Sequence, residues 1–453
     1  MEPYRLHVYV CDQKKPEGAP CCSARGSVRI IDELRRSVAA AGLGEQVQVT
    51  TCGSLGLCER GPNLVVYPEG VWYSGVGVED VSAIVQEHFI GGRPVERLVN
   101  RDEAALRTEI DGNKRKMLSA LAAQAAAGVL PDHFQQAVRG FQPSRVLLTA
   151  IELDVFTSVG KGARSDEVAA ALGTDPRATG MLLDALVALE ILAKADGAYR
   201  NTPLSERYLV AGARDDARAA LLHSANLWPR WSTLTECVRQ GTSVAYREMQ
   251  DRGDEWTTAF IAAMHRSAAA RAPLVVRTAE VDRVHRMLDV GGGSGAYAIA
   301  FAQANPDMVV EVFDLPTVLP ITRGHIEEAG LSDRITTRSG DLRSDGFGSG
   351  FDLVFLSAIC HMLGSAGNQD LVGRCFAALS PGGRVLIQDF ILTPDRTSPR
   401  SAALFALNML VGTPEGSTYT SAQYRAWLSQ AGFVDIRHVS LPGPTGLMFG
   451  SHP

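Results

Sequence analysis

The chain has 453 residues, of which 45% are hydrophobic and 21% are charged, and its formal net charge is −6. This composition excludes intrinsic disorder, and the length predicts two or three domains. The acidic balance argues against nucleic acid and anionic membranes as partners. No apolar run reaches the ~20 residues of a membrane-spanning helix. The N-terminus lacks the pattern of a signal peptide, so we expect a cytoplasmic protein.

The first hundred residues predict a compact α/β domain over 1–100. Alternating β-rich runs at 6–10 and 46–51 indicate strands on either side of a helix over 27–43. Two short strands separated by the turn PEG then form a hairpin, and a helix over 80–89 completes the unit.

The next region is predicted to be helical. Residues 101–135 are charged and then alanine-rich, which indicates a helical linker. Within 136–225, the segment 165–192 is typical of a helix-turn-helix, and a short hairpin follows it like the wing of a winged helix. The apolar faces of these helices exceed what one small unit can cover, so we expect a homodimer.

The helix-turn-helix raises the hypothesis of a redox-sensing regulator that binds DNA. The helix that would enter the major groove carries Arg177 against Asp184 and Glu190. A helix in that position needs net positive charge to displace counterions from the phosphates. We therefore expect no binding to nucleic acid.

From residue 283 onward, strands and helices alternate, which predicts a doubly wound, Rossmann-like parallel sheet within a domain over 226–453. The sequence DVGGGSG, residues 289–295, lies between a strand and a helix, where glycines let the backbone approach a ligand and the helix offers free amides. The dinucleotide pattern G-x-G-x-x-G/A is met only loosely. The pattern D-x-G-x-G-x-G is met fully by four residues: Asp289, Gly291, Gly293 and Gly295.

Acidic residues follow three neighbouring strands of this sheet. A carboxylate at Asp289 would repel a pyrophosphate but attract a cationic amino-acid portion. Asp314 can accept hydrogen bonds from ribose hydroxyls, Asp341 can meet an adenine amino group, and Leu342 can pack on the adenine ring. This arrangement favours S-adenosylmethionine (SAM) over NAD, with an oxidoreductase that passes electrons to NAD as the alternative.

The motifs DVGGGSG, FDLP, GDL and SPGGRVLIQDF, in that order, resemble the small-molecule methyltransferases of the acetylserotonin and caffeic-acid O-methyltransferase type. The resemblance covers about residues 130–450. It implies SAM-dependent methyl transfer and a winged-helix segment that serves dimerisation. Because some members of this fold methylate carbon, the acceptor atom stays open, although O-methylation is favoured.

The resemblance also implies catalytic residues. His361, in FLSAICHMLG, occupies the position of the family's general base, and Asp389 matches the carboxylate that orients it. An imidazole with a pKa of about 6.5 can accept a proton at neutral pH from a phenol, whose pKa is ~10. His265 is a weaker candidate for the base.

The sequence departs from the family pattern at neighbouring positions. Met362 and Leu363 stand where Asp and Trp are usual. A second family carboxylate aligns with Thr418, with Glu415 close by. Apolar segments at 222–275 and 405–419 are expected to line the acceptor pocket, which suggests a flat aromatic or polyketide-like small molecule.

Five of the eight cysteines lie in the first 58 residues. In a reducing compartment such a group predicts metal binding rather than disulfides, and four thiolates suit a 2Fe–2S cluster or zinc. A metal-free structural remnant is the alternative.

Residues 5–95 are similar to the thioredoxin-like 2Fe–2S ferredoxins. The similarity implies four cluster ligands: Cys11, Cys22, Cys52 and Cys58. Cys22 is preferred over Cys21 because it precedes an A-R-G sequence. Ser54 stands where the family has its third cysteine, so Cys52 and Ser54 remain alternatives for that ligand.

The sequence thus predicts an α/β protein with a thioredoxin-like ferredoxin domain, a winged-helix dimerisation domain and a Rossmann-like methyltransferase domain. Methyl transfer is redox-neutral and does not require the cluster. The fused domain would serve electron transfer with a partner protein, redox sensing or docking.

Overall fold

The computed structural model describes residues 4–15, 19–128, 130–247, 254–443 and 445–453. The chain forms two compact units, which we call the N-terminal unit (residues 1–138) and the C-terminal unit (residues 139–453). Among the described residues, no helix combines the length and apolarity needed to cross a bilayer.

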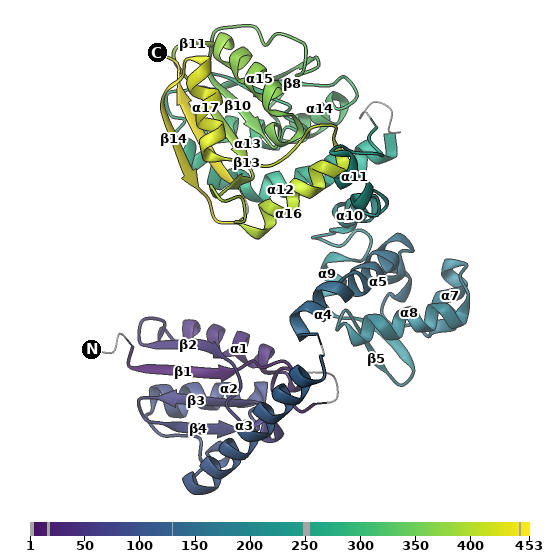
Figure 1. The fold of residues 1–453 in the computed structure, drawn as a ribbon, viewed down its shortest axis with the longest axis vertical. Helices are drawn as coiled ribbons and strands as arrows, with labels where there is room; N and C mark the ends of the chain where they lie inside the picture. The colour runs from purple at the N-terminus through teal and green to yellow at the C-terminus, as the bar shows by residue number, and fades with distance from the viewer. Residues whose placement is uncertain (1–3, 16–18, 129, 248–253, 444) are drawn as a thin grey trace. The chain divides into compact units, whose positions relative to one another are not determined.

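The N-terminal unit is built on a mixed four-stranded sheet in the order β2-β1-β3-β4 (Figure 1). Its strands are β1 (Leu6–Cys11), β2 (Val47–Cys52), β3 (Asn63–Tyr67) and β4 (Val71–Ser74). β1 runs parallel to β2 and antiparallel to β3, and β4 is antiparallel to β3. Parallel pairing of β1 and β2 puts their carboxyl ends at the same edge of the sheet.

Two helical segments pack against the sheet and complete the core of this unit. α1 (Ser27–Ala40) buries an apolar stripe spaced for one helical face: Ile30, Ile31, Leu34 and Val38. α2 (Val81–Ala83) continues into the π-helix η4 (Ile84–Ile90). Short 3₁₀ turns complete the unit: η1 (Ser23–Arg25), η2 (Cys58–Arg60), η3 (Val78–Asp80) and η5 (Glu96–Leu98). The predicted strands and helices of the first hundred residues are confirmed.

The predicted linker forms α3 (Glu103–Ala126), which is followed by α4 (Asp132–Arg139). α3 is packed against the loop between β2 and β3. A Cβ atom at Gly56 would lie 3.1 Å from Ile110 Cγ2, and Asn113 Nδ2 donates to Gly56 O over 2.7 Å. The first half of α3 is therefore held against the loop that carries Cys52 and Cys58, which a solvated linker helix would not be.

The C-terminal unit begins with a helical part that contains the predicted winged helix. Its elements are α5 (Phe141–Glu152), α6 (Val155–Val159), α7 (Ser165–Leu172), α8 (Pro176–Ala188), β5 (Leu192–Ala195), β6 (Ala198–Asn201) and α9 (Pro203–Tyr208). Asp175 caps α8 by accepting a hydrogen bond from Ala178 N over 2.8 Å. The Asp184 carboxylate pairs with Lys194 on β5 over 2.6 Å, so it ties α8 to the wing.

The second part of this unit is a seven-stranded sheet in the order β14-β15-β11-β10-β7-β8-β9. Its strands are β7 (Arg286–Val290), β8 (Val309–Asp314), β9 (Ile335–Ser339), β10 (Phe351–Ser357), β11 (Leu379–Asp389), β14 (Val434–Ser440) and β15 (Gly446–Ser451). The central pairs from β9 to β11 are parallel, and β15 is antiparallel to both of its neighbours.

Helices pack on the faces of this sheet, namely α12 (Asp254–Ala279), α13 (Ala296–Ala304), α14 (Leu319–Glu328), α15 (Ser365–Ala378) and α17 (Ser421–Ala431). The helices α10 (Arg218–Trp231), α11 (Leu234–Gln240) and α16 (Arg400–Gly412) pack against one another and, through α10, against α12. One core joins the sheet to α12 and α13, and another joins it to α15 and α17. Two short strands, β12 (Ile391–Leu392) and β13 (Tyr419–Thr420), pair near α16. The predicted doubly wound sheet is confirmed.

The strand order fixes where a ligand can bind. The chain enters the sheet at β7 and then moves outward in one direction through β8 and β9, and later in the other through β10 and β11. Ligands of open α/β sheets bind at such a switch point, outside the carboxyl ends of the strands. A ligand-binding site is therefore expected at the loops after β7, β8, β10 and β11.

Candidate active site

The loop after β7 has a backbone that only glycine allows. Gly291, Gly293 and Gly295 have φ angles of +67°, +57° and +78°, in the left-handed region. A Cβ atom on Gly291 would lie 2.4 Å from Ile359 Cδ1 and 3.5 Å from Leu342 Cδ2. The backbone at Gly291 therefore packs closely against Ile359, from the loop after β10, and Leu342, from the loop after β9. A side chain at this position would not fit.

Asp289, at the end of β7, is a buried carboxylate that lacks a partner. It is 1% exposed, and neither of its oxygens makes a well-formed hydrogen bond within the described residues. Burial, together with the nearby charge of Asp314, raises the pKa of Asp289 to about 7, against a smaller opposing effect of the Ala298 backbone. A cationic ligand beside this carboxylate would supply the missing interaction.

Asp314, at the end of β8, holds the glycine loop in place. Its Oδ2 accepts a hydrogen bond from Gly293 N over 2.7 Å, and its Oδ1 accepts one from Leu315 N over the same distance. Burial raises the pKa of Asp314, and the two backbone donors oppose that rise. Each carboxylate oxygen has a second lone pair, so Asp314 can still accept hydrogen bonds from a ligand hydroxyl.

Asp341, after β9, forms contacts with Arg343 that the sequence did not predict. Its Oδ2 pairs with Arg343 Nη2 over 2.9 Å, and its Oδ1 accepts the Arg343 backbone N–H over 2.9 Å. These contacts hold the pKa of Asp341 below its ordinary value. Any ligand donor that reaches Asp341 therefore shares the carboxylate with an arginine two residues away.

A histidine and an aspartate meet at the neighbouring strand ends. His361 lies on the 3₁₀ turn η7 (Cys360–Met362) after β10, and Asp389 ends β11. The imidazole Nδ1 donates to Asp389 Oδ1 over 2.6 Å, and the His361 backbone N–H donates to Asp389 Oδ2 over 3.1 Å. Because a carboxylate can only accept, this contact puts the imidazole proton on Nδ1 and leaves the Nε2 lone pair free.

Aromatic rings enclose this pair. The Phe405 ring, on α16, lies edge-on to the His361 ring with centroids 4.9 Å apart. Phe390 stacks on Phe405 with centroids 4.0 Å apart. His361 is 6% exposed and Asp389 is 1% exposed. Such a setting restricts water around a basic nitrogen and provides ring surfaces for an apolar ligand. Phe405 belongs to the apolar segment 405–419 that was expected to line the acceptor pocket, but nothing in the sequence indicated its contact with His361.

At the position of the family's second carboxylate this chain has Thr418, and the nearby Glu415 does not take its place. Thr418 is fully buried, and its hydroxyl donates to Ala402 O over 3.1 Å. Glu415 is exposed and lies against Gly364. The Thr418 hydroxyl therefore serves the packing of α16.

His265 lies at the glycine loop. Its Nδ1 is 2.9 Å from Ser294 Oγ, and its ring stacks on that of His325. These contacts are with the loop that follows β7 and with α14, not with the His361–Asp389 pair, so the position of His265 does not suit the general base. The sequence had no signal for this stacking, because the two histidines are on separate helices.

In the N-terminal unit, cysteines gather at the carboxyl edge of β1 and β2. Cys11 and Cys52 are direct neighbours across these parallel strands. Cys22 donates to the Cys11 sulfur, which lowers the pKa of Cys11 to about 6 and raises that of Cys22. Burial raises the pKa of Cys52 to about 11. The fourth cysteine, Cys58, has its Sγ 3.4 Å from the hydroxyl of Ser54.

These thiols converge without forming a ready metal site. All eight cysteines are free thiols. Within the described ranges, no group of three or more His, Cys, Asp or Glu side chains is arranged to hold a metal ion. The predicted 2Fe–2S cluster therefore has its ligand residues close together but not in a binding geometry.

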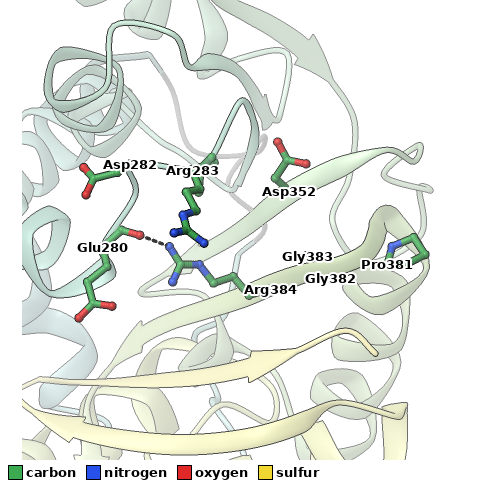
Figure 2. A pocket seen from close by; sticks show the side chains of 9 residues that line it. Glu280, Asp282, Arg283, Asp352, Pro381, Gly382, Gly383 and Arg384 are labelled. Carbon is green, nitrogen blue, oxygen red and sulfur yellow. Dashed lines mark hydrogen bonds between the residues drawn. The ribbon is translucent and has the colours of Figure 1, made fainter.

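A polar cleft of about 590 Å³ lies at the other edge of the large sheet (Figure 2). It is lined by residues that precede β7, including Arg283, by Asp352 at the start of β10 and by the first half of β11, including Arg384. Arg384 Nη2 donates to Glu280 O over 2.5 Å. Because the cleft lies at the amino ends of the strands, it is separate from the glycine loop and the His361–Asp389 pair.

Comparison with known proteins identifies the class of enzyme that carries such a site. An O-methyltransferase domain matches residues 231–434, and an O-methyltransferase dimerisation domain matches residues 135–211. The chain belongs to the O-methyltransferase family and is a SAM-dependent enzyme of that family. Residues 1–134 lie outside both matched segments.

Particular relatives agree with this assignment. The 3-hydroxy-5-methyl-1-naphthoate 3-O-methyltransferase of Streptomyces sahachiroi is 34% identical over 320 residues, which cover 69% of this chain and 92% of the relative. Acetylserotonin O-methyltransferase of Bos taurus is 32% identical, with 66% and 91% covered. The tetracenomycin polyketide synthesis 8-O-methyl transferase TcmO of Streptomyces glaucescens is 31% identical, with 71% and 97% covered.

Solved structures give the same result. Human N-acetylserotonin methyltransferase in complex with SAM aligns with a TM-score of 0.64 at 26% identity, covering 72% of this chain and 99% of the other. The structure of PigF with S-adenosylhomocysteine (SAH) aligns with a TM-score of 0.67 at 25% identity, covering 71% and 100%. Family membership favours methyl transfer over both alternatives, the NAD oxidoreductase and the DNA-binding regulator.

Proposed function

We propose that this enzyme methylates a hydroxyl group of a small aromatic or polyketide-like molecule, with His361 as the general base. The observation that carries the proposal is the 2.6 Å contact between His361 Nδ1 and Asp389 Oδ1. It leaves Nε2 as the atom that accepts the hydroxyl proton. The names of the naphthoate and tetracenomycin relatives support an aromatic or polyketide-like acceptor.

His361 accepts the proton, and Asp389 orients and stabilises His361. When bound, the cofactor supplies a methyl group on a positively charged sulfur. His361 takes the hydroxyl proton as the oxygen–methyl bond forms, because an imidazole is neutral and basic near pH 7. Asp389 then stabilises the imidazolium, while the hydrogen bonds that it accepts from His361 N and Phe390 N orient the carboxylate. Phe405 limits water around the transferring proton.

We assign the cofactor site to seven residues at or just after the carboxyl ends of β7, β8 and β9, namely Asp289, Gly291, Gly293, Gly295, Asp314, Asp341 and Leu342. The unpartnered carboxylate of Asp289 supports a cationic amino-acid portion beside it. Asp314 has lone pairs left for ribose hydroxyls, and Leu342 faces Gly291 as one wall of an adenine pocket. The adenine amino group would share Asp341 with Arg343.

The dimerisation domain over residues 135–211 supports a homodimer. Exposed apolar residues within this region are suited to a second copy of the chain: Phe141, Met181 and Leu204.

Two measurements test the proposed function. Calorimetric titration with SAH and with NADH distinguishes the cofactors, and we expect binding of SAH alone. Incubation with SAM and hydroxylated naphthoates or anthracyclic phenols, followed by mass spectrometry, should reveal an O-methylated product. Binding of NADH in preference to SAH would reject the proposal.

We also propose that the N-terminal unit binds a 2Fe–2S cluster through Cys11, Cys22, Cys58 and either Cys52 or Ser54. Support comes from the gathering of these residues at one sheet edge and from the strand order β2-β1-β3-β4, which suits a thioredoxin-like unit. The lack of a ready metal site among the described side chains means that the loops would have to rearrange on loading.

Anaerobic purification with measurement of iron, acid-labile sulfide and the visible spectrum tests the cluster. Loaded protein should lose its colour in Cys11→Ala but keep it in Cys21→Ala, because Cys21 is outside the proposed ligand set. Comparing Cys52→Ala with Ser54→Ala then identifies the remaining ligand. Iron-free, colourless protein after reconstitution with iron and sulfide would reject the cluster, together with electron transfer to a partner.

A further inference from the structure

The hydroxyl of Ser294 connects the glycine loop to a histidine. Ser294 lies between Gly293 and Gly295 and is 4% exposed. Its Oγ is 2.9 Å from Nδ1 of His265, which is on α12. The loop that would hold the cofactor is thus connected to α12 by one hydrogen bond that a change in protonation can alter.

A second histidine lies directly against the first. The His325 ring, on α14, stacks on the His265 ring with centroids 4.2 Å apart and an angle of 13° between the planes. His325 Nδ1 is 3.5 Å from Glu328 Oε2 on the same helix. The titratable groups that act on His265 are these two residues of α14. Burial and His325 lower the pKa of His265, and Glu328 opposes them.

We propose that His265 is a positioning residue that holds the cofactor loop through Ser294, and that protonation of His265 weakens binding of the cationic cofactor. The inference rests on the proposed placement of SAM at the loop after β7. It adds a role that neither the general base nor the acidic residues of the cofactor site perform.

The chemistry gives the direction of the effect. When His265 is neutral, its Nδ1 can accept the Ser294 hydroxyl proton, and the histidine adds no charge to the loop. When His265 is protonated, Nδ1 becomes a donor, and a positive charge lies beside a loop that must receive a sulfonium and an ammonium group. Stacking against His325 disfavours that state further, because two imidazolium rings repel one another.

Cofactor affinity should therefore be constant above about pH 7 and fall as the pH drops below the ordinary histidine pKa of about 6.5. The fall begins below that value because the pKa of His265 is lowered in the folded protein. Burial is the larger cause of the lowering and His325 the second, so both affect the pH at which the fall occurs.

The test is the dissociation constant for SAM and for SAH, measured by calorimetry between pH 5.5 and 8 on the full chain. We expect the wild type to lose SAM affinity progressively below pH 6.5, toward a limit of about tenfold for one pKa unit of coupling, a limit that lies at lower pH than this range reaches. SAH, whose sulfur is neutral, should lose less. His265→Asn keeps a hydrogen-bonding group near Ser294 and cannot titrate, so its SAM affinity should stay flat.

Two further variants sharpen the result. His325→Phe keeps a stacked ring but removes the like charge, so the fall should move to higher pH. His438→Asn is the matched control, because burial also lowers the pKa of His438, which is on the edge strand β14, and this variant should behave as the wild type. Circular dichroism at each pH identifies any variant that unfolds.

The inference is overturned if wild-type SAM affinity is independent of pH, or if His265→Asn loses affinity in acid as the wild type does. Failure to bind SAM at pH 8 would instead reject the proposed function. The two failures are therefore distinguishable in one data set.

Discussion

The Nδ1 atom of His361 and the Oδ1 atom of Asp389 lie 2.6 Å apart, although the two residues are 28 positions apart in the chain. Parallel pairing makes this contact, since Ser357 near the end of β10 is the neighbour of Gln388 near the end of β11. Each strand then delivers one polar side chain to the same edge. The pair is thus a consequence of strand register, and it fixes which imidazole nitrogen is free.

Replacing Asp389 by asparagine should reduce kcat by about 10² to 10⁴, the usual contribution of a general base. An asparagine amide can donate to Nδ1, which would move the imidazole proton to Nε2 and remove the acceptor. The affinity for SAH should change little. Asp389→Glu, tested beside it, should recover part of the activity if the carboxylate acts on the tautomer. Equal kcat values for wild type and Asp389→Asn would show that the carboxylate does not act on the base.

Asp289→Asn should make the unliganded enzyme more stable and the cofactor bind more weakly. The folded-state pKa of Asp289 is raised to about 7, above the ordinary 3.8, so ionisation opposes folding as the pH rises between these values. At pH 8 the variant should gain up to about 4 kcal/mol in free energy of unfolding, the equivalent of about three pKa units. Thermal denaturation at pH 5 and pH 8, with and without SAM, measures this.

The stabilisation by SAM should be smaller in Asp289→Asn than in the wild type, because the variant lacks the charge that attracts the cofactor. A variant that is both less stable at pH 8 and equally good at binding SAM would contradict the assignment.

Gly291→Ala should abolish cofactor binding. The added Cβ would come within 2.4 Å of Ile359 Cδ1, and the φ angle of +67° is unfavourable for alanine. Gly324→Ala, on α14, is the matched control, because no atom lies within 4 Å of its Cβ position and its backbone is helical. The control should bind SAH as the wild type does and gain about 0.4–1 kcal/mol in stability. Calorimetry and thermal denaturation separate the two outcomes.

Phe405→Ala should raise KM for an aromatic acceptor and lower kcat. The variant removes the ring that stacks on Phe390 and meets the edge of His361. We expect a loss of about tenfold or more in kcat/KM, because truncating this half-buried ring removes packing around His361 together with contact to the acceptor. Leu404→Ala on the same helix is the control, since Leu404 is 48% exposed. Similar losses in both variants would mean a general effect on α16.

Much of the fold could be predicted because its signals are local. Alternating apolar residues predicted the strands around DVGGGSG, and the spacing of four residues from Asp289 to Gly295 predicted a ligand loop whose φ angles require glycine. The resemblance to the methyltransferase family named His361 and Asp389, and the pairing of β10 with β11 explains why the two residues meet.

The rest depends on side-chain partners that spacing does not encode. Nothing in the sequence indicates that Arg343 engages Asp341, or that the Thr418 hydroxyl donates to Ala402. The stack of His265 on His325 joins two helices far apart in the chain. These contacts depend on rotamers and on how helices pack, which are decided only in three dimensions.

The most direct test of the central claim is the single-turnover rate of methyl transfer to a phenolic acceptor, measured against pH for the wild type and for His361→Asn. If His361 accepts the proton, the wild-type rate should reach a plateau once the imidazole is neutral. The variant should be slower by about 10² or more at pH 7, and its rate should keep rising toward the phenol pKa of ~10. Superimposable profiles for the two proteins would contradict the account.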